Sequence, residues 1–373
     1  MNYTLITTDA GLQQVCEQAR THAQIALDTE FVRTRTYYPQ LGLIQLYDGE
    51  QLSLIDPLPI TQWQPFIDLL SDKAVVKYLH AGSEDLEVFL NAFQTLPTPL
   101  VDTQILAAFT GRPLSCGFAT LVAAYMQVEL DKSESRTDWL ARPLTERQCQ
   151  YAAADVFYLL PMAGQLVQEV EQAGWTEAAS NECLLLCQRR SETLAPELAY
   201  REINNAWQLR PRQLGCLQKL AAWRLQQARA SAIWRLISSC GREPVGGGAS
   251  YAGLHGRAGR IGPERPGDPF PRKTLLALVA EANALDEAAL PPPVANLVEH
   301  PGYKKVFKEI KAAIAAVSEQ SGLSSELLAS RRQINQLLNW HWKLKNSDCQ
   351  PELINGWRAG LLAEPLLAIL QSY

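Results

Sequence analysis

The amino-acid sequence predicts an α/β domain with a mixed sheet at residues 1–193, followed by two small all-α domains at 194–290 and 291–373. In the first segment, short apolar runs alternate with amphipathic patterns, as strands and helices do in such a domain. From residue 194 onward helical spacing predominates, and three consecutive prolines at 291–293 separate the two helical parts. At 373 residues the chain is long enough for a hydrophobic core in each domain.

The order of elements in the first domain indicates how its sheet is built. We expect strands at 25–28, 41–47, 52–55, 75–80 and 100–101, and helices at 12–19, 83–92, 103–109, 118–125 and 145–170. Short turns join the early strands, whereas helices separate the later ones. This order predicts a mixed sheet with a hairpin at one edge, rather than a doubly wound parallel sheet.

Two carboxylates stand at the end of the first expected strand. Asp28 and Glu30 are spaced i, i+2, so their side chains project to the same face. Like charges that close need a cation, and a divalent metal ion makes such a pair useful for phosphodiester chemistry. A polar strand end followed by a turn explains these residues equally well when they are taken alone.

Two further acidic positions have a suitable context. Asp85 lies in the first turn of a helix directly after a buried strand, although the helix dipole alone favours an acidic residue there. Tyr151 and Asp155 share one face of a helix that begins with a capping-box pattern at Thr145. Taken alone, a Tyr and an Asp at this spacing usually form a solvated helix face.

In combination, the strand Asp-x-Glu, the Asp at the start of a helix and the Tyr-x-x-x-Asp resemble the DEDD superfamily of 3′→5′ exonucleases, in the branch with a tyrosine in the third motif. The surrounding residues resemble the ribonuclease D family over nearly all of the first 160 residues, in the segments 28–33, 38–46, 80–85, 132–133, 138–144 and 151–155. This resemblance implies a ribonuclease H-like first domain. It also implies two HRDC-type helical domains, of the kind shared with RecQ-like helicases, and residues 326–333 fit that family well.

The resemblance also implies a catalytic site. Asp28, Glu30, Asp85 and Asp155 would hold two Mg²⁺ or Mn²⁺ ions, which suit ligands that are all oxygen atoms, and Tyr151 would orient the attacking water. Whether the Tyr151 phenol acts as a base is left open here, since an unperturbed tyrosine has a pKa near 10. The candidate RNA contacts are two aromatic residues and three arginines: Phe31, Tyr38, Arg33, Arg35 and Arg142. The aromatic residues fit the core equally well, and the arginines could pair with nearby carboxylates.

Charge is distributed unevenly along the chain. Up to residue 193 there are 12 Lys and Arg against 24 Asp and Glu, whereas from 194 onward there are 22 against 15. An acidic half can hold metal ions and a basic half can hold a phosphate backbone, with Lys304, Lys305, Lys308 and Lys311 as one candidate basic face. Such an asymmetry also arises by chance, and a run of lysines is usually a solvated face.

Cysteine spacing and hydropathy bear on where the protein works. The eight cysteines form no CxxC pair and no Cys/His zinc spacing, so we expect reduced thiols. No signal-like segment follows Met1, and no apolar stretch of about 18 residues occurs. We therefore expect a soluble, cytoplasmic protein with no membrane partner. We also expect it to be a monomer.

One stretch, 231–272, departs from the family because it is rich in Gly, Arg and Pro and has no helical periodicity. A disordered linker is the ordinary interpretation. A second hypothesis is a shifted reading frame, restored near Lys273, because back-translation in another frame gives a family-like sequence. Resequencing the DNA distinguishes the two. Under either hypothesis the first helical domain should be poorly formed.

The function expected from the resemblance is a 3′→5′ exoribonuclease that releases 5′-mononucleotides by two-metal-ion hydrolysis and processes tRNA 3′ ends. Its RNA partners would include tRNA precursors and other structured RNA 3′ ends. The alternatives are a 3′→5′ DNA exonuclease, since the carboxylates do not distinguish the sugar, and a non-catalytic RNA-binding scaffold. A metal-dependent phosphatase is a more distant alternative, which the basic helical half disfavours.

Overall fold

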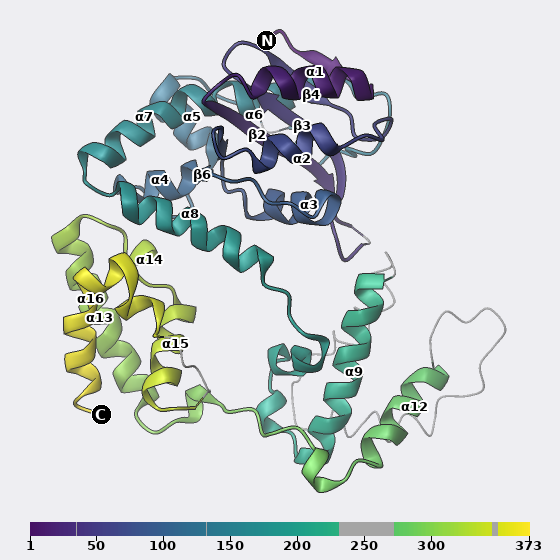
Figure 1. The fold of residues 1–373 in the computed structure, drawn as a ribbon. Helices are drawn as coiled ribbons and strands as arrows, with labels where there is room; N and C mark the ends of the chain where they lie inside the picture. Colours follow the sequence, from purple (N-terminus) through teal and green to yellow (C-terminus); the bar gives the residue numbers. More distant parts are fainter. Residues whose placement is uncertain (35, 132, 231–271, 345–349) are drawn as a thin grey trace. The chain divides into compact units, whose positions relative to one another are not determined.

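The computed structural model describes the whole chain except residues 35, 132, 231–271 and 345–349 (Figure 1). The chain forms two compact units. The first comprises Met1–Val32, Pro39–Glu192 and Leu297–Tyr373, and the second comprises Arg33–Tyr38 and Thr193–Asn296. The C-terminal helices therefore belong to the same unit as the sheet domain.

A six-stranded mixed sheet forms the centre of the first unit. Its strands are β1 (Thr4–Ile6), β2 (Gln24–Val32), β3 (Gln40–Tyr47), β4 (Leu52–Ile55), β5 (Val76–Leu79) and β6 (Leu100–Asp102), in the spatial order β1-β4-β3-β2-β5-β6. The strands β2, β3 and β4 pair antiparallel, whereas β1 pairs with β4, β5 with β2 and β6 with β5 in parallel. The predicted mixed sheet is thus confirmed. The hairpin does not lie at an edge as expected, because β1 pairs with β4 and becomes the outer strand.

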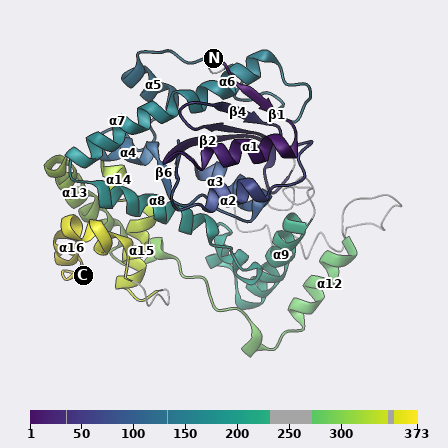
Figure 2. The ribbon, with the colours of Figure 1, turned by 45° about the horizontal axis from the view of Figure 1, so that its top comes forward.

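Helices cover both faces of this sheet, as Figure 2 shows. One face packs against α1 (Asp9–Ala19), α2 (Gln64–Ser71) and α3 (Ser83–Phe93); the other packs against α4 (Thr103–Phe109), α5 (Phe118–Met126), α6 (Glu146–Phe157) and α7 (Leu159–Gln172). Alternate side chains of β2 point to opposite faces of the sheet. Ile25 and Leu27 pack in the hydrophobic core under α1, α2 and α3, and Ala26 packs in the core under α4 to α7. The strand β2 is therefore buried on both faces.

The expected long helix at 145–170 is wrong, because the structure divides it at Tyr158 into α6 and α7. The cause is Pro161, which has no N–H to donate to a carbonyl one turn earlier, so a new helix starts with this proline in its first turn. Within the first domain, three elements were not expected from the sequence: β1, α2 and α8 (Thr176–Ser191).

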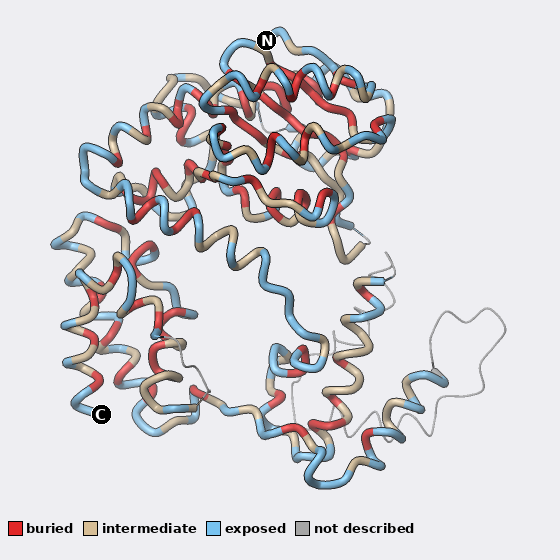
Figure 3. Tube along the Cα trace, viewed as in Figure 1, coloured by how far each residue is buried: buried red, intermediate tan, exposed pale blue. Residues whose placement is uncertain are grey.

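The C-terminal part of the first unit is helical. It contains η4 (Leu297–Glu299), α13 (Tyr303–Ser321), α14 (Ser325–Leu328), α15 (Arg331–His341), η5 (Glu352–Ile354) and α16 (Gly356–Leu370). Its buried residues, among them Val306, Leu337 and Leu366, form one hydrophobic cluster together with α4, α6 and α7 of the sheet domain. Figure 3 shows the buried stripes along these helices.

The second unit contains η1 (Pro196–Glu202), η2 (Ala206–Gln208), α9 (Pro211–Ala230), α12 (Arg272–Asn283) and η3 (Glu287–Ala289). Tyr200, Leu214 and Leu217 form its small core. The boundaries predicted at 193 and 290 stay predictions. The atypical segment 231–272 lies outside the described residues apart from Arg272, as do Arg35 and Lys132. No described helix combines the length and apolar character needed to cross a membrane.

Candidate active site

Asp28 and Glu30 lie within β2 rather than at its end. The strand continues to Val32 because β3 pairs with it along its length, and Asp28 stands opposite Gln45. A bulge follows Glu30, where the register against β3 shifts by one residue. The two carboxylates lie on the face of the sheet that α6 covers, since α6 supplies their partner Asp155.

Helix α6 brings Tyr151 and Asp155 to these carboxylates. The helix starts with the predicted capping box, in which Thr145 and Gln148 each accept a hydrogen bond from the other's backbone N–H. Asp28, Glu30 and Asp155 each offer an oxygen atom within 4.8 Å of the others. The half-buried ring of Tyr151 lies 6.1 Å from that of Trp139.

Asp85 approaches the cluster from the other layer. It lies in the first turn of α3, is 6% exposed, and its carboxylate accepts a hydrogen bond from the Thr29 hydroxyl. Thr29 can make this bond because its side chain points to the opposite face of β2 from Asp28 and Glu30. Asp85 is outside the group of three carboxylates, yet its charge acts on all of them. The structure thus brings all four predicted acidic residues together.

Burial raises the pKa of every carboxyl group in the cluster, and repulsion by other cluster members raises it further for Asp28, Glu30 and Asp155; for Asp85 the repelling charge is Asp102, while the hydrogen bond from Thr29 lowers its pKa. Burial is the larger cause throughout; it raises the pKa of Glu30 to about 9, of Asp155 to about 7 and of Asp85 to about 6. The pKa of Asp28 is raised well above its usual value by burial and then by the charges of the other three. Burial is also the larger cause that raises the pKa of the Tyr151 phenol, and among the neighbouring charges that of Asp155 has the largest effect.

These residues fit a divalent metal ion. Their donor atoms are all carboxylate oxygens, the set that Mg²⁺ and Mn²⁺ prefer. Across the described part of the chain, no ion pair links any of the four to Lys, Arg or His. Because no basic side chain relieves the repulsion between these carboxylates, a bound cation would stabilise the site.

Two polar residues beside the carboxylates were not predicted from the sequence. Thr29 binds Asp85, and Gln45 donates a hydrogen bond from its amide nitrogen to Asp28 over 3.4 Å. Gln45 is fully buried within an otherwise apolar stretch of β3, and this isolated polar residue was the available signal. For Thr29 the signal was its place between two carboxylates, on the other face of the strand.

The predicted RNA contacts fall in different places. Phe31 is half-buried in β2 directly after the bulge, whereas Arg33 and Tyr38 belong to the second unit. Arg142 donates to both oxygens of Asp56, at 2.7 and 2.8 Å, and to the carbonyl of Gly42. These contacts match the alternative interpretation of Arg142 as part of an ion pair. The RNA contacts stay predictions.

Comparison with known proteins agrees with this geometry. The family described as 3′-5′ exonuclease matches residues 3–171, and the family described as the C-terminal HRDC domain of ribonuclease D matches residues 301–366. A ribonuclease D from Serratia proteamaculans is 75% identical, and the match covers 100% of both chains. The chain belongs to the ribonuclease D family. Another ribonuclease D, from Escherichia coli, is 60% identical, again over 100% of both chains.

The fold of a ribonuclease D agrees as well. The crystal structure of Escherichia coli RNase D, described as an exoribonuclease involved in structured RNA processing, superposes with a TM-score of 0.89 at 57% identity over 100% of both chains. The expected family and fold class are therefore confirmed, and so is the general activity: this member of the ribonuclease D family is a metal-dependent 3′→5′ exoribonuclease with an HRDC domain.

Proposed function

We propose that this exoribonuclease removes nucleotides one at a time from RNA 3′ ends and releases 5′-monophosphates, with Asp28, Glu30, Asp85 and Asp155 holding two Mg²⁺ or Mn²⁺ ions. The observation that carries this proposal is the cluster of carboxylates whose pKa values are all raised. When bound, two such ions would activate the attacking water and neutralise the charge on the leaving 3′ oxygen.

The positions of the four carboxylates suggest how they would share the two ions. Asp28 and Glu30 on β2 and Asp155 on α6 form the close group of three, which is suited to share one ion. Asp85 comes from the other layer and its charge acts on Asp28, so it would serve as a ligand of the second ion. A rigid strand and two helices hold these ligands, which limits their rearrangement during the reaction.

Tyr151 is the candidate for orienting the attacking water. Its pKa is raised by burial and by Asp155, Glu30 and Asp28, so the phenol keeps its proton at neutral pH. A protonated phenol can donate one hydrogen bond and accept another, but it is a poor general base. We therefore assign Tyr151 a positioning task through hydrogen bonds, rather than proton abstraction.

The RNA substrates we propose are the 3′ trailers of tRNA precursors and other structured RNA 3′ ends. Two observations support this. The related Escherichia coli enzyme is described as acting in structured RNA processing. The half of the chain after residue 193 has an excess of seven positive charges, which would bind the backbone of a folded RNA next to its 3′ end.

One experiment tests the function and its alternatives together. A tRNA precursor with a 3′ trailer, an unstructured RNA and a DNA of the same sequence are labelled at their 5′ ends and incubated with and without Mg²⁺. We expect stepwise shortening of the labelled RNA, dependent on Mg²⁺, and release of unlabelled 5′-mononucleotides, which chromatography detects. Faster shortening of the DNA would favour a DNA exonuclease, and binding without cleavage would indicate a scaffold.

We also propose that the active form is a monomer. The support is that each unit closes a hydrophobic core with residues of a single chain. Light scattering during size-exclusion chromatography measures the mass directly, and a mass near twice 41.4 kDa would contradict the proposal.

A further inference from the structure

The turn before α3 determines where Asp85 lies. β5 ends at Leu79 and α3 begins at Ser83, so three residues connect a buried strand to the helix that carries Asp85. Within this turn Ala81 has φ +53°, in the left-handed region that a residue with a Cβ atom disfavours. A turn in this conformation needs contacts from outside to persist.

The carboxylate of Asp102 supplies those contacts. One of its oxygens accepts hydrogen bonds from the backbone N–H of Ala81 at 3.1 Å and of Gln104 at 2.8 Å, and the other accepts from the N–H of Gly82 at 2.8 Å. Asp102 is 2% exposed, so these bonds are shielded from water. Two of the three bonds fix the turn, and the third caps α4.

The position of Asp102 is itself fixed by the sheet and by α8. Asp102 is the last residue of β6 and pairs in register with Leu79, the last residue of β5, so its side chain starts beside the turn. Its own N–H donates to the Cys183 sulfur on α8 at 3.3 Å. Asp102 is therefore held on both sides while it holds the turn.

We propose that Asp102 is a positioning residue for the nuclease reaction: it holds the turn 80–82 in the conformation that directs Asp85 to the other three carboxylates. The inference rests on the proposed role of Asp85 as a metal ligand. The competing interpretation is a purely local one, in which Asp102 caps α4 and nothing more, as aspartates commonly do.

Asp102→Ser separates these two interpretations. Serine is a favoured N-cap residue, so its hydroxyl can still accept from Gln104. It is too short to accept from Ala81 and Gly82 as well. Asp102→Asn is a second variant of nearly the same shape, which turns an NH₂ group toward one or more of these N–H donors.

The matched control is Asp48→Asn. Asp48 is also buried, at 5% exposure, and one of its oxygens accepts from the N–H groups of Glu50 and Gln51 in the turn between β3 and β4. The control therefore removes an equivalent turn-holding carboxylate from the same sheet, but from a turn that carries none of the four acidic residues.

The measurements are the Kd for Mn²⁺ by calorimetry on the full chain without RNA, and kcat and KM on a short RNA. For both Asp102 variants we expect at least fivefold weaker Mn²⁺ binding at one site, at least tenfold lower kcat, and KM within about twofold of wild type. Raising Mn²⁺ should restore part of the lost kcat. A purely structural role would not produce this metal-dependent rescue.

Two outcomes overturn the inference: Asp102→Ser with wild-type Mn²⁺ affinity and kcat, or Asp48→Asn with the same losses as the Asp102 variants. A third variant, Asp85→Asn, distinguishes failure of this inference from failure of the proposed function. If Asp85→Asn retains full Mn²⁺ affinity and kcat, the proposed role of Asp85 fails. If it loses both while Asp102→Ser does not, only the positioning role of Asp102 fails.

Discussion

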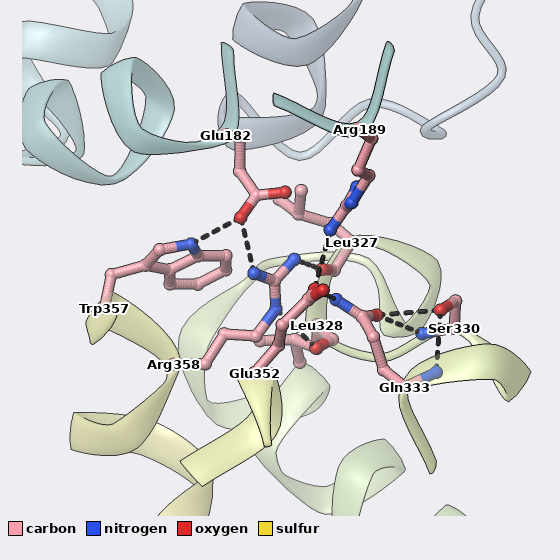
Figure 4. A network of polar contacts seen from close by, with 9 residues as sticks. All are labelled: Glu182, Arg189, Leu327, Leu328, Ser330, Gln333, Glu352, Trp357 and Arg358. Atoms are coloured by element: carbon pink, nitrogen blue, oxygen red, sulfur yellow. Dashed lines mark hydrogen bonds and ion pairs between the residues drawn. The ribbon is translucent and has the colours of Figure 1, made fainter. Parts of the chain in front are cut away.

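Arg358 on α16 and Glu182 on α8 form a buried ion pair between the HRDC domain and the sheet domain, 176 residues apart in the chain (Figure 4). The same Glu182 oxygen accepts from the Trp357 indole N–H at 2.9 Å, and Arg358 also donates to the carbonyls of Leu327 and Leu328. Because each guanidinium nitrogen has an acceptor, this pair meets the condition under which a buried charge is tolerated.

We predict that Arg358→Met lowers the free energy of unfolding by about 3–5 kcal/mol, because it leaves the Glu182 carboxylate buried without its cation. Glu182→Gln should cost less, since its amide oxygen can still accept from Arg358 and Trp357. Urea denaturation measures both. As a control, Arg147→Met removes an arginine that is 73% exposed and should change stability by less than about 1 kcal/mol. Equal effects from Arg358→Met and Arg147→Met would contradict this account.

The second prediction concerns the carboxylate cluster. Asp28→Asn and Asp155→Asn should each lower kcat by at least about 100-fold, since each deletes a charge that holds metal in the transition state. Both variants should stay folded, and without metal they should be more stable than wild type because repulsion is relieved. The control Asp68→Asn makes the same charge change on the exposed face of α2. Undiminished turnover in a normally folded Asp28→Asn protein would exclude the assigned site.

The third prediction is a pH dependence of stability in EDTA. Native pKa values of about 9 for Glu30, 7 for Asp155 and 6 for Asp85 exceed those of unfolded carboxyl groups near 4, so the native state holds more protons. The free energy of unfolding should therefore fall from about pH 4 to about pH 9. The fall is about 1.4 kcal/mol per pH unit for each carboxyl group that is ionised in the unfolded chain but still protonated in the native protein. Mg²⁺ should flatten this dependence, because it favours the ionised forms.

Urea titrations at several pH values, with EDTA or with Mg²⁺, measure this effect. Asp28→Asn should reduce the slope in EDTA, because it removes Asp28 itself, a carboxyl group whose native pKa is raised well above its usual value. A free energy of unfolding that rises from pH 5 to pH 8 in EDTA would show that other groups dominate.

Local spacing in the sequence was sufficient to predict part of the site. An i, i+2 pair on a strand and an i, i+4 pair on a helix lie on one face whatever the rest of the fold does, so Asp28 with Glu30 and Tyr151 with Asp155 were predictable as pairs. That the two pairs face each other followed from the family resemblance and not from spacing. The packing of α6 against β2, which brings Asp155 within 4.8 Å of Asp28 and Glu30, confirms it.

The contacts that support the site were not predictable in this way. Thr29 binds Asp85 over 56 residues and Asp102 binds Gly82 over 20, and no periodicity relates residues at such separations. The ion pair of Arg358 and Glu182 has the same character, because it depends on which surface of the sheet domain the HRDC domain covers. The break at Tyr158 had a local signal in Pro161. The expected helix at 145–170 followed the helical periodicity and disregarded this proline.

The fourth prediction concerns the phenol of Tyr151. Tyr151→Phe should lower kcat about tenfold to 100-fold with little change in KM, because the ring stays and only the hydrogen bond to the attacking water is lost. Since the pKa of Tyr151 is raised, its ionisation should not contribute to the rate below pH 9. The pH profile of kcat should therefore keep its shape in the variant. A profile whose alkaline limb depends on Tyr151 would show that the phenol acts as a base.

The last prediction concerns a chain that ends near residue 195. The sequence predicts that this form keeps metal-dependent turnover on short RNA, because all four carboxylates and Tyr151 remain. The structure adds that it should be less stable, because Phe109, Trp175 and Glu182 lose their contacts with Trp357 and Arg358. Its melting temperature should therefore fall, and assays belong below that temperature.

At such a temperature the truncated form should bind a tRNA precursor more weakly than the full chain does, since it lacks the half with 22 Lys and Arg against 15 Asp and Glu. Its affinity should also respond less to salt, because each phosphate contact that is lost removes nearly one unit from the slope of log K against log salt. KM and this slope, measured on a tRNA precursor and on a short RNA, are the readouts. An unchanged KM and slope on the precursor would show that the part of the chain after residue 195 does not bind RNA.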